Sequence, residues 1–439
     1  MEKRPAGARM RRITVIGTGY VGLTTGACLA SLGHRVVCCD VDAAKIGQLS
    51  RGEVRIREPG LQELVHGGTA SGRLAFEVDA VPAAARSDFV FLCVPTPMAT
   101  DGGADLAAVE SVVREIRGSL RPGCVLVTKS TVPVGTAARL VALTGRRDVA
   151  VVSNPEFLRE GFAVQDFLHP DRIVVGSESE AAAAAVAGLY APLAAPTIRT
   201  DAASAELVKY AANCFLAAKL SYVNDISELC ERLAVDVLDI TEAMRRDRRI
   251  APSFLSPGPG WGGSCLPKDA AALLRAAEVA GLDLPMVRAA IDANAGHRER
   301  VVSKVVDACG GSVSGVRLAL LGLTFKAGTN DLRDSPALEI ARLLAERGAD
   351  LVAYDPAVRG DELALMGRLT CVDDPYQAAK GARVMVLLTD WPEFGDLDWS
   401  RLAELAEQPE LIDTRNQLAP GVLRRAGLRW RGTGRAGGA

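Results

Sequence analysis

The feature that most constrains the fold is a glycine-rich turn near the start of the chain, GTGYVG at residues 17–22. It follows a short apolar strand-like segment at residues 12–16 and leads into an apolar helical segment. A second strand-like segment ends at Asp40, 18 residues after Gly22. In a βαβ unit such glycines allow a tight turn and a close approach of pyrophosphate to the helix N-terminus, and the acid binds ribose hydroxyls. The pattern predicts a dinucleotide-binding Rossmann unit.

The position of the acid also favours one cofactor. A carboxylate at Asp40 would repel the 2′-phosphate of NADP, so the sequence favours NAD. Lys45 follows closely and can reach the cofactor phosphates, although a solvated charge on a helix is an equal interpretation.

The chain of 439 residues is too long for one core, so two or three domains are expected. Strand-like and helix-like segments alternate up to residue 199, and a second alternation begins near Val316. We therefore predict an α/β protein with two Rossmann-like, doubly wound parallel sheets. The expected parts are an NAD-binding domain at 10–199, a central helical region at 200–300 and a C-terminal Rossmann-like domain at 312–430.

Residues 200–235 are expected to form one long linking helix, capped by Thr200 or Asp201. Apolar residues recur along it at helical spacing, at Leu207, Ala211, Cys214, Phe215, Ala218, Ile226, Leu229 and Leu233. Such a helix can pack against its copy, so a homodimer is expected. Lys209 and Asn213 lie one turn apart on it, either as a functional pair or as an exposed polar face.

Polar turns follow several strand-like segments of the first half, namely Phe89–Val94, Val125–Thr128, Val149–Ser153 and Arg172–Gly176. Ligands bind beyond the carboxyl ends of strands in such sheets. Thr131, Glu156 and Glu160 are the candidate polar groups there. Glu156 and Glu160 would share a face if a helix began at residue 155, and both would then also fit ordinary surface carboxylates.

The stretch GPGWGGSCLPKD, at residues 258–269, predicts a flexible loop that enters a helix near Cys265. The positive end of the helix dipole stabilises a thiolate at this position. Asp269 lies four residues on, on the same helical face. These features favour a covalent catalytic centre. The alternative is a glycine-rich turn with a buried structural cysteine.

Composition excludes several classes of function. The net charge of −2 gives no basic face for nucleic acid. The ten cysteines form no CxxC pair, which fits a reducing cytoplasm, and the four isolated histidines offer no zinc site. We therefore expect no metal ion. No apolar run reaches membrane-spanning length. The C-terminal residues RGTGRAGGA, at 431–439, are expected to be disordered.

Across about residues 10–430 the sequence resembles the nucleotide-sugar dehydrogenases. The motifs that carry the resemblance are GTGYVGL, CVPTPMATDGGADL, STVPVGT, NPEFLREGFAVQDFLHPDRIVVG, ELVKYAANCFLA, DRRIAPSFL, GPGWGGSCLPKD, TFKAGTNDLRDSP and IDTRN. The resemblance implies a cytoplasmic enzyme that oxidises UDP-glucose to UDP-glucuronate with two NAD and one water. A cysteine thiohemiacetal and thioester would be its intermediates, and no metal would be needed.

The resemblance also implies roles for individual residues. Its catalytic residues would be Cys265, Lys209, Asn213, Asp269, Glu156 and Thr131. NAD would contact Gly17, Gly19, Tyr20, Val21, Gly22, Asp40, Lys45, Thr96, Thr131, Glu160, Lys268 and Arg333. The UDP-sugar would contact Glu156, Phe157, Leu158, Lys209, Asn213, Arg249, Phe254, Leu255, Gly262, Lys326 and Arg415, with Arg249 supplied by the neighbouring subunit.

Other interpretations stay open. A related sugar, GDP-mannose or a UDP-N-acetylhexosamine, would suit the same motifs, although the PDRIVVG ending at 170–176 favours UDP-glucose. A simple two-electron dehydrogenase would need no thiol, and a sensor of nucleotide sugars would not turn over. Trp261 and Leu266 stand where the family usually has phenylalanine or tyrosine, and Ala251 and Thr414 stand where glycine is common.

Overall fold

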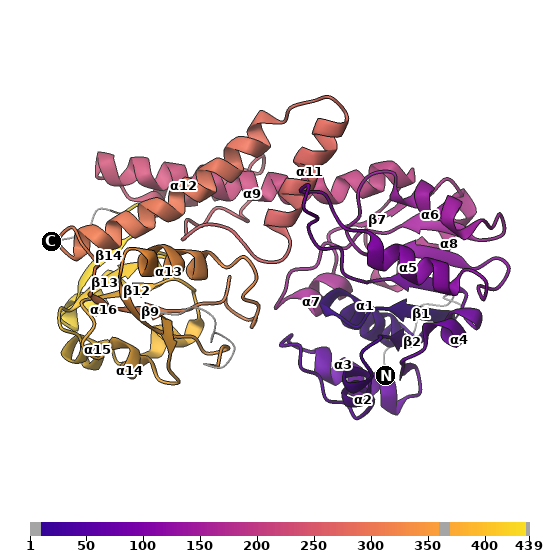
Figure 1. Ribbon diagram of the computed structural model, residues 1–439, viewed down its shortest axis with the longest axis horizontal. Coiled ribbons are helices and arrows are strands. Elements are labelled where there is room, and N and C mark those ends of the chain that lie inside the picture. Colours follow the sequence, from indigo (N-terminus) through magenta and orange to yellow (C-terminus); the bar gives the residue numbers. More distant parts are fainter. Residues whose placement is uncertain (1–9, 360–368, 436–439) are drawn as a thin grey trace. The chain divides into compact units, whose positions relative to one another are not determined.

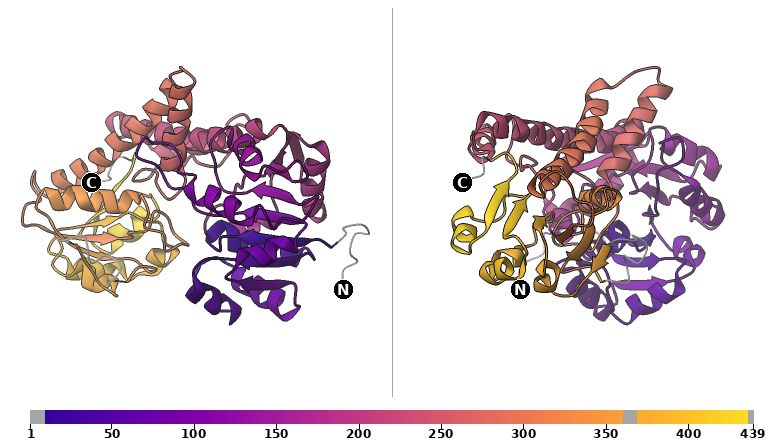
Figure 2. Two further views of the ribbon diagram at one scale, coloured as in Figure 1. Left: turned by 45° about the vertical axis from the view of Figure 1, so that its right-hand side comes forward. Right: turned by 60° about the vertical axis from the view of Figure 1, so that its left-hand side comes forward.

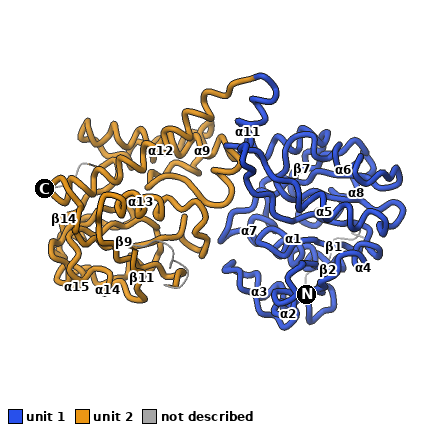
Figure 3. Tube along the Cα trace, in the orientation of Figure 1, with its two compact units in different colours: residues 1–212, 271–281 blue, residues 213–270, 282–439 orange. Residues whose placement is uncertain are grey.

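The computed structural model describes residues 10–359 and 369–435. Its contacts divide the chain into two compact units (Figure 3). Unit 1 holds the residues up to 212 together with 271–281, and unit 2 holds 213–270 together with the residues from 282 onward. The long helix α9, Ala202–Leu233, starts in unit 1 and ends in unit 2. The predicted three-part division of the chain stays a prediction.

Unit 1 is built on an eight-stranded sheet of order β3-β2-β1-β4-β5-β6-β7-β8 (Figure 1). The strands from β1 to β6 are parallel, β6 meets β7 in an antiparallel pair at Ser153 and Gly176, and β7 and β8 are parallel to each other. Their bounds are β1 Arg12–Ile16, β2 Arg35–Cys39, β3 Leu74–Glu77, β4 Phe89–Leu92, β5 Val125–Thr128, β6 Ala150–Ser153, β7 Ile173–Gly176 and β8 Thr197–Thr200.

Alternating side chains bury both faces of this sheet. Ile13 and Val15 of β1 belong to one core with α1, α3, α7 and α8, and Ile16 belongs to the other core with α4, α5 and α6. Two covered faces are what near-continuous apolar strands require. The helices are α1 Tyr20–Ser31, α2 Ala43–Ser50, α3 Leu61–Ala70, α4 Ala80–Ala85, α5 Ala107–Ile116, α6 Thr136–Thr144, α7 Ala163–Leu168, α8 Glu180–Ala187 and the 3₁₀ helix η1 Gly188–Leu193.

Unit 2 contains a six-stranded parallel sheet of order β11-β10-β9-β12-β13-β14, seen again in Figure 2. Its strands are β9 Arg317–Leu321, β10 Asp350–Tyr354, β11 Leu369–Cys371, β12 Val384–Leu387, β13 Glu410–Asp413 and β14 Arg429–Gly432. This order reverses between β9 and β12, as the order in unit 1 reverses between β1 and β4. The two Rossmann-like sheets predicted from the sequence are thereby confirmed.

Helices again cover both faces of the second sheet. One core joins the sheet to α12 Pro285–Ala308 and α13 Pro336–Glu346. The other joins it to α14 Pro375–Ala379, η3 Pro392–Asp396, α15 Trp399–Leu405 and α16 Pro420–Arg425. The remaining helices are α10 Val237–Arg246 and α11 Leu266–Val279. Within the described part of the chain, no helix combines the length and apolarity that spanning a bilayer demands.

The predicted long helix is present, and Asp201 caps it by accepting the backbone N–H of Ser204 at 2.8 Å. One condition left open by the sequence is not met, and one local expectation was wrong. No helix begins at residue 155, because the carboxylate of Glu156 accepts the backbone N–H of Leu158 at 2.6 Å and folds the segment into a turn instead.

The C-terminal tail was also expected to be disordered, yet Gly432 ends β14. The backbone N–H of Gly434 donates to Glu231 of α9 at 2.7 Å, and its carbonyl accepts the N–H of Val237 at 2.9 Å. Strand pairing, the Glu231 carboxylate and a backbone bond to Val237 therefore order the tail, and Arg435 adds a bond to Asp236 at 2.8 Å. Residues 436–439 lie outside the described residues.

Candidate active site

The glycine turn of unit 1 has the shape that a dinucleotide needs. Gly17 has a φ of +96°, and a Cβ there would lie 2.5 Å from the carbonyl oxygen of Cys93. A Cβ on Gly22 would lie 1.9 Å from the carbonyl oxygen of Gly17, so the turn can close only without side chains. A Cβ on Gly19, in contrast, would meet nothing within 4 Å. The turn is therefore tight inside and open beside Gly19, where a pyrophosphate needs close approach.

Asp40 lies where β2 ends and holds this turn. Its Oδ2 accepts the backbone N–H of Thr18 at 2.9 Å, the Thr18 hydroxyl at 2.7 Å and Nζ of Lys45 at 2.9 Å. Partial burial alone would raise the pKa of Asp40, but the bonds from Thr18 and Lys45 lower it to about 2. The group is an anion at neutral pH, as ribose recognition requires.

Tyr20 connects the glycine turn to the segment after β6. Its hydroxyl donates to the buried carboxylate of Glu58 and accepts the backbone N–H of Gly161 at 2.6 Å. Val21 packs against the apolar core of unit 1. These contacts place Gly161 beside the start of α1.

A buried ion pair lies within unit 1. Nζ of Lys209 on α9 lies 2.7 Å from Oε1 of Glu156, and the two side chains are 4% and 5% exposed. Burial would raise the pKa of Glu156, but the charge and hydrogen bond of Lys209 lower it. The ring of Phe157 contacts two cations, with its centroid 3.7 Å from Cζ of Arg172 and 5.6 Å from Nζ of Lys209. A desolvated charged pair of this kind is well suited to stabilise developing charge.

Two neighbouring strand ends also meet beside the Rossmann turn. The hydroxyl of Thr96, after β4, donates to the backbone carbonyl of Thr131, after β5, at 2.8 Å. Thr131 and Glu160 are partly exposed, so both can reach a ligand.

In unit 2, Cys265 immediately precedes the first residue of α11, Leu266, as the sequence predicted. The backbone N–H of Asp269 donates to the carbonyl of Cys265 at 2.9 Å, which forms the first helical turn. The carboxylate of Asp269 is fully buried and accepts Nδ2 of Asn213 at 2.6 Å and Nζ of Lys268 at 2.5 Å. A partly exposed thiol thus lies one turn before a fixed carboxylate.

The loop before Cys265 is held by buried polar side chains of α9 and α12. Asn224 accepts the N–H of Gly258 at 3.0 Å, and a ring nitrogen of His297 lies 2.7 Å from the Gly258 carbonyl. Asn294 bonds both backbone groups of Trp261, at 2.8 and 2.9 Å, and the Trp261 indole N–H donates to Ser221 at 2.8 Å. These four side chains are buried and hydrogen-bonded to the loop, so the loop has one preferred conformation.

The same loop packs closely on the first turn of the second sheet. A Cβ on Gly262 would lie 1.9 Å from the carbonyl oxygen of Asp334, and one on Gly263 would lie 2.7 Å from the ring of Phe325. That turn is fixed by Asp355, which follows β10 and accepts the backbone N–H groups of Leu323 and Thr324 at 2.7 and 3.0 Å. Only glycine fits these two loop positions.

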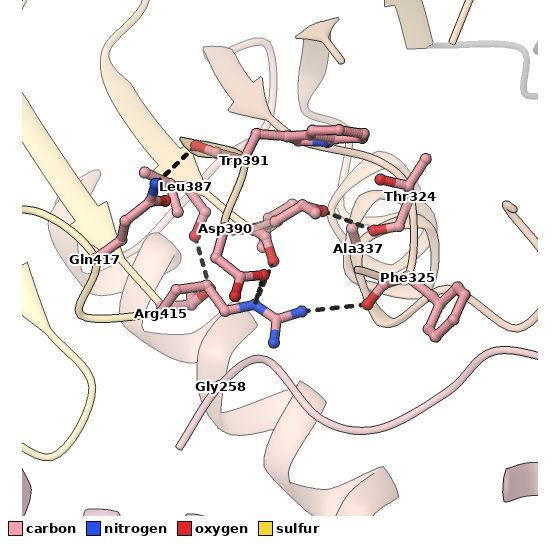
Figure 4. A network of polar contacts seen from close by, with 12 residues as sticks. Gly258, Thr324, Phe325, Ala337, Leu387, Asp390, Trp391, Arg415 and Gln417 are labelled. Carbon is pink, nitrogen blue, oxygen red and sulfur yellow. Dashed lines mark hydrogen bonds and ion pairs between the residues drawn. The ribbon is translucent and has the colours of Figure 1, made fainter. Parts of the chain in front are cut away.

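Arg415 lies where the carboxyl ends of the second sheet meet this turn (Figure 4). Its Nε donates to the carbonyl of Leu388 at 3.0 Å and its Nη2 to the carbonyl of Phe325 at 3.3 Å. Gly258 lies close by, since a Cβ there would be 3.0 Å from Nη1 of Arg415. Nζ of Lys326 lies 5.3 Å from the Phe325 ring centroid. Two cations at the switch point of a parallel sheet suit a diphosphate.

The remaining predicted residues of unit 2 are more dispersed. The side chain of Arg249 is 89% exposed and pairs with Asp247 at 2.6 Å. Arg333 pairs with Asp331 at 2.6 Å. Phe254 has a φ of 61°, a strained conformation for an aromatic residue, and the side chain of Leu255 is buried. Leu255 can therefore offer a ligand only its backbone.

The sequence assigned no role to several buried polar residues, namely Lys129, Asn154, Tyr190, Asn294 and His297, or to the half-buried Arg298. Lys129 alone had a usable signal, since it stands in the turn after β5 and the chain has few lysines. The residues of α12 had no such signal. In the sequence, a polar helical residue that is buried against a distant loop cannot be distinguished from a polar residue on an exposed helical face.

Comparison with known proteins agrees with this geometry. Residues 11–194, 203–296 and 319–420 match the NAD binding, central and UDP binding domains of the UDP-glucose/GDP-mannose dehydrogenase family. The chain is 43% identical to the UDP-glucose 6-dehydrogenase of Rhizobium meliloti (strain 1021), over 97% of this chain and 99% of that protein. It is 42% identical to the UDP-glucose 6-dehydrogenase TuaD of Bacillus subtilis (strain 168), over 97% and 94%.

Among solved structures, a UDP-glucose dehydrogenase from the archaeon Pyrobaculum islandicum superposes with a TM-score of 0.91. It is 38% identical, and the match covers 99% of this chain and 100% of that one. The fold, the two switch points and the full-length similarity agree, and the chain belongs to the UDP-glucose/GDP-mannose dehydrogenase family.

Proposed function

We propose that the protein is an NAD-dependent UDP-glucose 6-dehydrogenase that oxidises UDP-glucose to UDP-glucuronate. The observation that carries this is Cys265, a partly exposed thiol at the start of a helix. One turn further on lies the buried carboxylate of Asp269, which accepts hydrogen bonds from Asn213 and Lys268. The two bacterial relatives named above carry the same activity in their names. A cytoplasmic location is proposed because no disulfide joins any of the ten cysteines, all of which lie within the described residues.

The residues of unit 1 fit NAD. Gly17, Gly19 and Gly22 form the turn for the pyrophosphate, and Asp40 would take the ribose hydroxyls. The further proposed contacts are Tyr20, Val21, Lys45, Thr96, Thr131, Glu160, Lys268 and Arg333. When bound, the nicotinamide would accept a hydride from C6 of the sugar, once for each of two oxidations.

The chain's own residues would carry the rest of the chemistry. After the first oxidation, the Cys265 sulfur would add to the C6 aldehyde, and its proton would pass to the carbonyl oxygen. The resulting thiohemiacetal would be oxidised to a thioester, so the aldehyde is never free. Water would then add to the thioester, with Glu156, Thr131 and Asp269 positioning or activating it. The C–S bond would break and return the thiol.

Charge develops on oxygen in each of these steps. Lys209 would stabilise an oxyanion as a compact cation, and Asn213 as a hydrogen-bond donor. The UDP half would be held by Lys326 and Arg415. The sugar would meet Phe157, Leu158, Phe254, Gly262 and the backbone of Leu255, and Arg249 would come from a second subunit.

The yield of NADH tests the proposal directly. With limiting UDP-glucose, full oxidation gives two NADH per sugar nucleotide, a simple dehydrogenase gives one, and a sensor gives none. Running the same assay with GDP-mannose and UDP-N-acetylhexosamines identifies the sugar. A higher kcat/KM for one of those than for UDP-glucose would contradict the proposed substrate.

Asp40→Ala is expected to weaken NAD binding and to leave UDP-glucose binding within about twofold, since the carboxylate would bind the cofactor ribose and holds only the turn of unit 1, through Thr18 and Lys45. Calorimetric titration of each ligand separately measures both effects. Asp148→Ala is the matched control, because it removes an exposed carboxylate of unit 1 that pairs only locally with Arg146. Equal loss of both ligands in the Asp40 variant would contradict the assignment.

We also propose that the protein is a homodimer through α9. Phe215, Tyr222, Leu229 and Leu233 form an apolar stripe on this helix and are 67%, 55%, 50% and 62% exposed. Leu229→Asp is expected to give monomers in sedimentation velocity and to lower activity, because Arg249 would lose its site. Val422→Asp places the same charge on an exposed apolar residue of α16 and should stay dimeric. A fully active monomer would refute the dimer proposal.

A further inference from the structure

Glu206 is a buried carboxylate to which the proposed chemistry gives no task. It lies in the second turn of α9 and is 1% exposed. Its Oε2 accepts the backbone N–H of Gly135 at 2.7 Å, and its Oε1 accepts that of Ala137 at 2.7 Å. Across residues 10–359 and 369–435, no basic side chain forms an ion pair with it. A buried carboxylate is expensive to desolvate, and here backbone N–H groups compensate that cost.

These two bonds supply a cap that α6 lacks. The helix begins at Thr136, and its N-cap residue, Gly135, has no side chain to accept the free N–H groups of the first turn. Glu206 accepts them instead, from 71 and 69 residues further along the chain. The cap of α6 is therefore also a connection between α6 and α9.

The segment between β5 and α6 is held at both of its ends. At the β5 end, the Thr96 hydroxyl donates to the carbonyl of Thr131 at 2.8 Å. At the α6 end, four residues after Thr131, Gly135 is bonded to Glu206 at 2.7 Å. Thr131 is partly exposed between these two attachments. Its position relative to α9 depends on the second attachment, because the first one joins it only to the segment after β4.

The same face of α9 carries Lys209. It lies three residues after Glu206, so both side chains leave one face of the helix. Lys209 pairs with Glu156 after β6 at 2.7 Å, and β5 and β6 are neighbouring parallel strands, so α9 is bonded to both segments that follow them. The start of α9 packs closely on the sheet, since a Cβ on Gly176, at the end of β7, would lie 2.5 Å from the carbonyl oxygen of Asp201.

We propose that Glu206 is a positioning residue for the oxidation. It holds the segment that carries Thr131 in register with Lys209, so that both groups meet the same reacting carbon, C6 of the sugar. A cap that lay within the first turn of α6 would stabilise the helix but would not fix this alignment. The inference rests on the proposed function, which gives Thr131 and Lys209 their roles.

Glu206→Gln tests the connection without changing the size of the side chain. The amide oxygen can accept one of the two N–H groups, and the NH₂ group faces the other. The kcat is expected to fall at least about tenfold, because a small displacement of a catalytic group is costly. KM for UDP-glucose should stay within about threefold. A parental kcat in Glu206→Gln would overturn the inference. If this variant does not fold, Glu206→Asp decides, since it keeps the charge but shortens the reach, and a parental kcat there would overturn the inference.

The double variant Glu206→Gln/Ala138→Asp separates positioning from helix stability. Ala138 is an exposed residue in the first turn of α6, so a carboxylate there interacts favourably with the positive end of the helix dipole without restoring the bond to α9. Tm should rise relative to Glu206→Gln, whereas kcat should stay low. Recovery of kcat together with Tm would mean that Glu206 serves only as a helix cap, and the inference would be wrong.

A double-mutant cycle tests whether Glu206 acts through Thr131. Thr131→Ala should lower kcat, and adding Glu206→Gln should lower it by less than about threefold further, because the segment no longer carries the group to be placed. Two losses that multiply in the double variant, or a parental kcat in Thr131→Ala, would contradict the proposed action.

A readout without turnover separates this inference from the proposed function. Hydrogen exchange of the substrate-free protein, followed by mass spectrometry, reports on the backbone amides of residues 129–137. These amides should exchange faster in Glu206→Gln than in the parent, whereas those of β3 should exchange equally in both. Equal exchange at 129–137 would refute the role of Glu206. The NADH yield of the parent judges the proposed function independently.

Discussion

Cys265→Ala is expected to abolish the formation of UDP-glucuronate almost completely while leaving UDP-glucose and NAD binding close to normal. The first oxidation needs no thiol, but the second, as proposed, needs a covalent adduct. The loop glycines and the bonds of Asn224, Asn294 and His297 remain, so the binding surface should stay formed. Single-turnover assays with separate detection of aldehyde, glucuronate and NADH measure the outcome.

Cys265→Ser makes a sharper comparison. The hydroxyl can still attack, but its ester leaves far more slowly than a thiolate, so turnover should fall at least ~10³-fold. A sugar-nucleotide adduct should accumulate on the peptide that contains residue 265, visible as added mass after acid quench. Cys309→Ala removes another partly buried free thiol and should behave as the parent. Parental rates in Cys265→Ala would show that the thiol is structural.

Lys209→Ala should lower kcat at least about 10²-fold and raise KM far less, because its charge is needed mainly in the transition states. It also leaves Glu156 buried without its nearest cation, 2.7 Å away in the parent, so Tm should fall. Steady-state kinetics and thermal unfolding of the same preparation separate the two effects.

The matched control is Lys304→Ala, which also removes a lysine from an ion pair, at 2.5 Å from Glu231. It should change Tm slightly and kcat not at all. The double variant Glu156→Gln/Lys209→Ala should recover stability without recovering kcat, because it removes the unpaired charge. An unchanged kcat in Lys209→Ala would return this lysine to a structural role.

Local sequence patterns were sufficient to predict the two Rossmann-like sheets and the long helix. The apolar run at Val125–Thr128 is a strand with the predicted bounds, and continuous apolar residues suit a sheet that is covered on both faces. The glycine turn and Asp40 were likewise recognisable, since their spacing is set by one βαβ unit.

Contacts between distant segments could not be read in the same way. The carboxylate of Glu156 accepts the backbone N–H of Leu158 and pairs with Lys209, far along the chain on α9, and the segment forms a turn in place of a helix with Glu160. The tail is ordered by contacts with Glu231 and Val237, and no pattern within the tail sequence predicts these contacts. The burial of Lys129 and His297 is likewise visible only in the folded structure, because the surrounding sequence does not show that they are removed from water. Periodicity reports which face is apolar, but it does not report which buried polar groups meet.

The two acids that hold the first turns of the sheets differ in what they leave for a ligand. Asp355 also accepts the Thr324 hydroxyl and the indole N–H of Trp391, both at 3.1 Å, and is enclosed, whereas Asp40 remains partly accessible. Of these two turns, only that of unit 1 can select a ribose. Under the proposed chemistry, both hydrides must therefore be transferred to NAD bound at one site, that of unit 1. The first NADH has to dissociate halfway through each cycle, while the covalent bond to Cys265 retains the sugar. Under that chemistry, the first NADH is released before UDP-glucuronate because the carboxylate of Asp355 is enclosed and unit 2 offers no second ribose site at this turn.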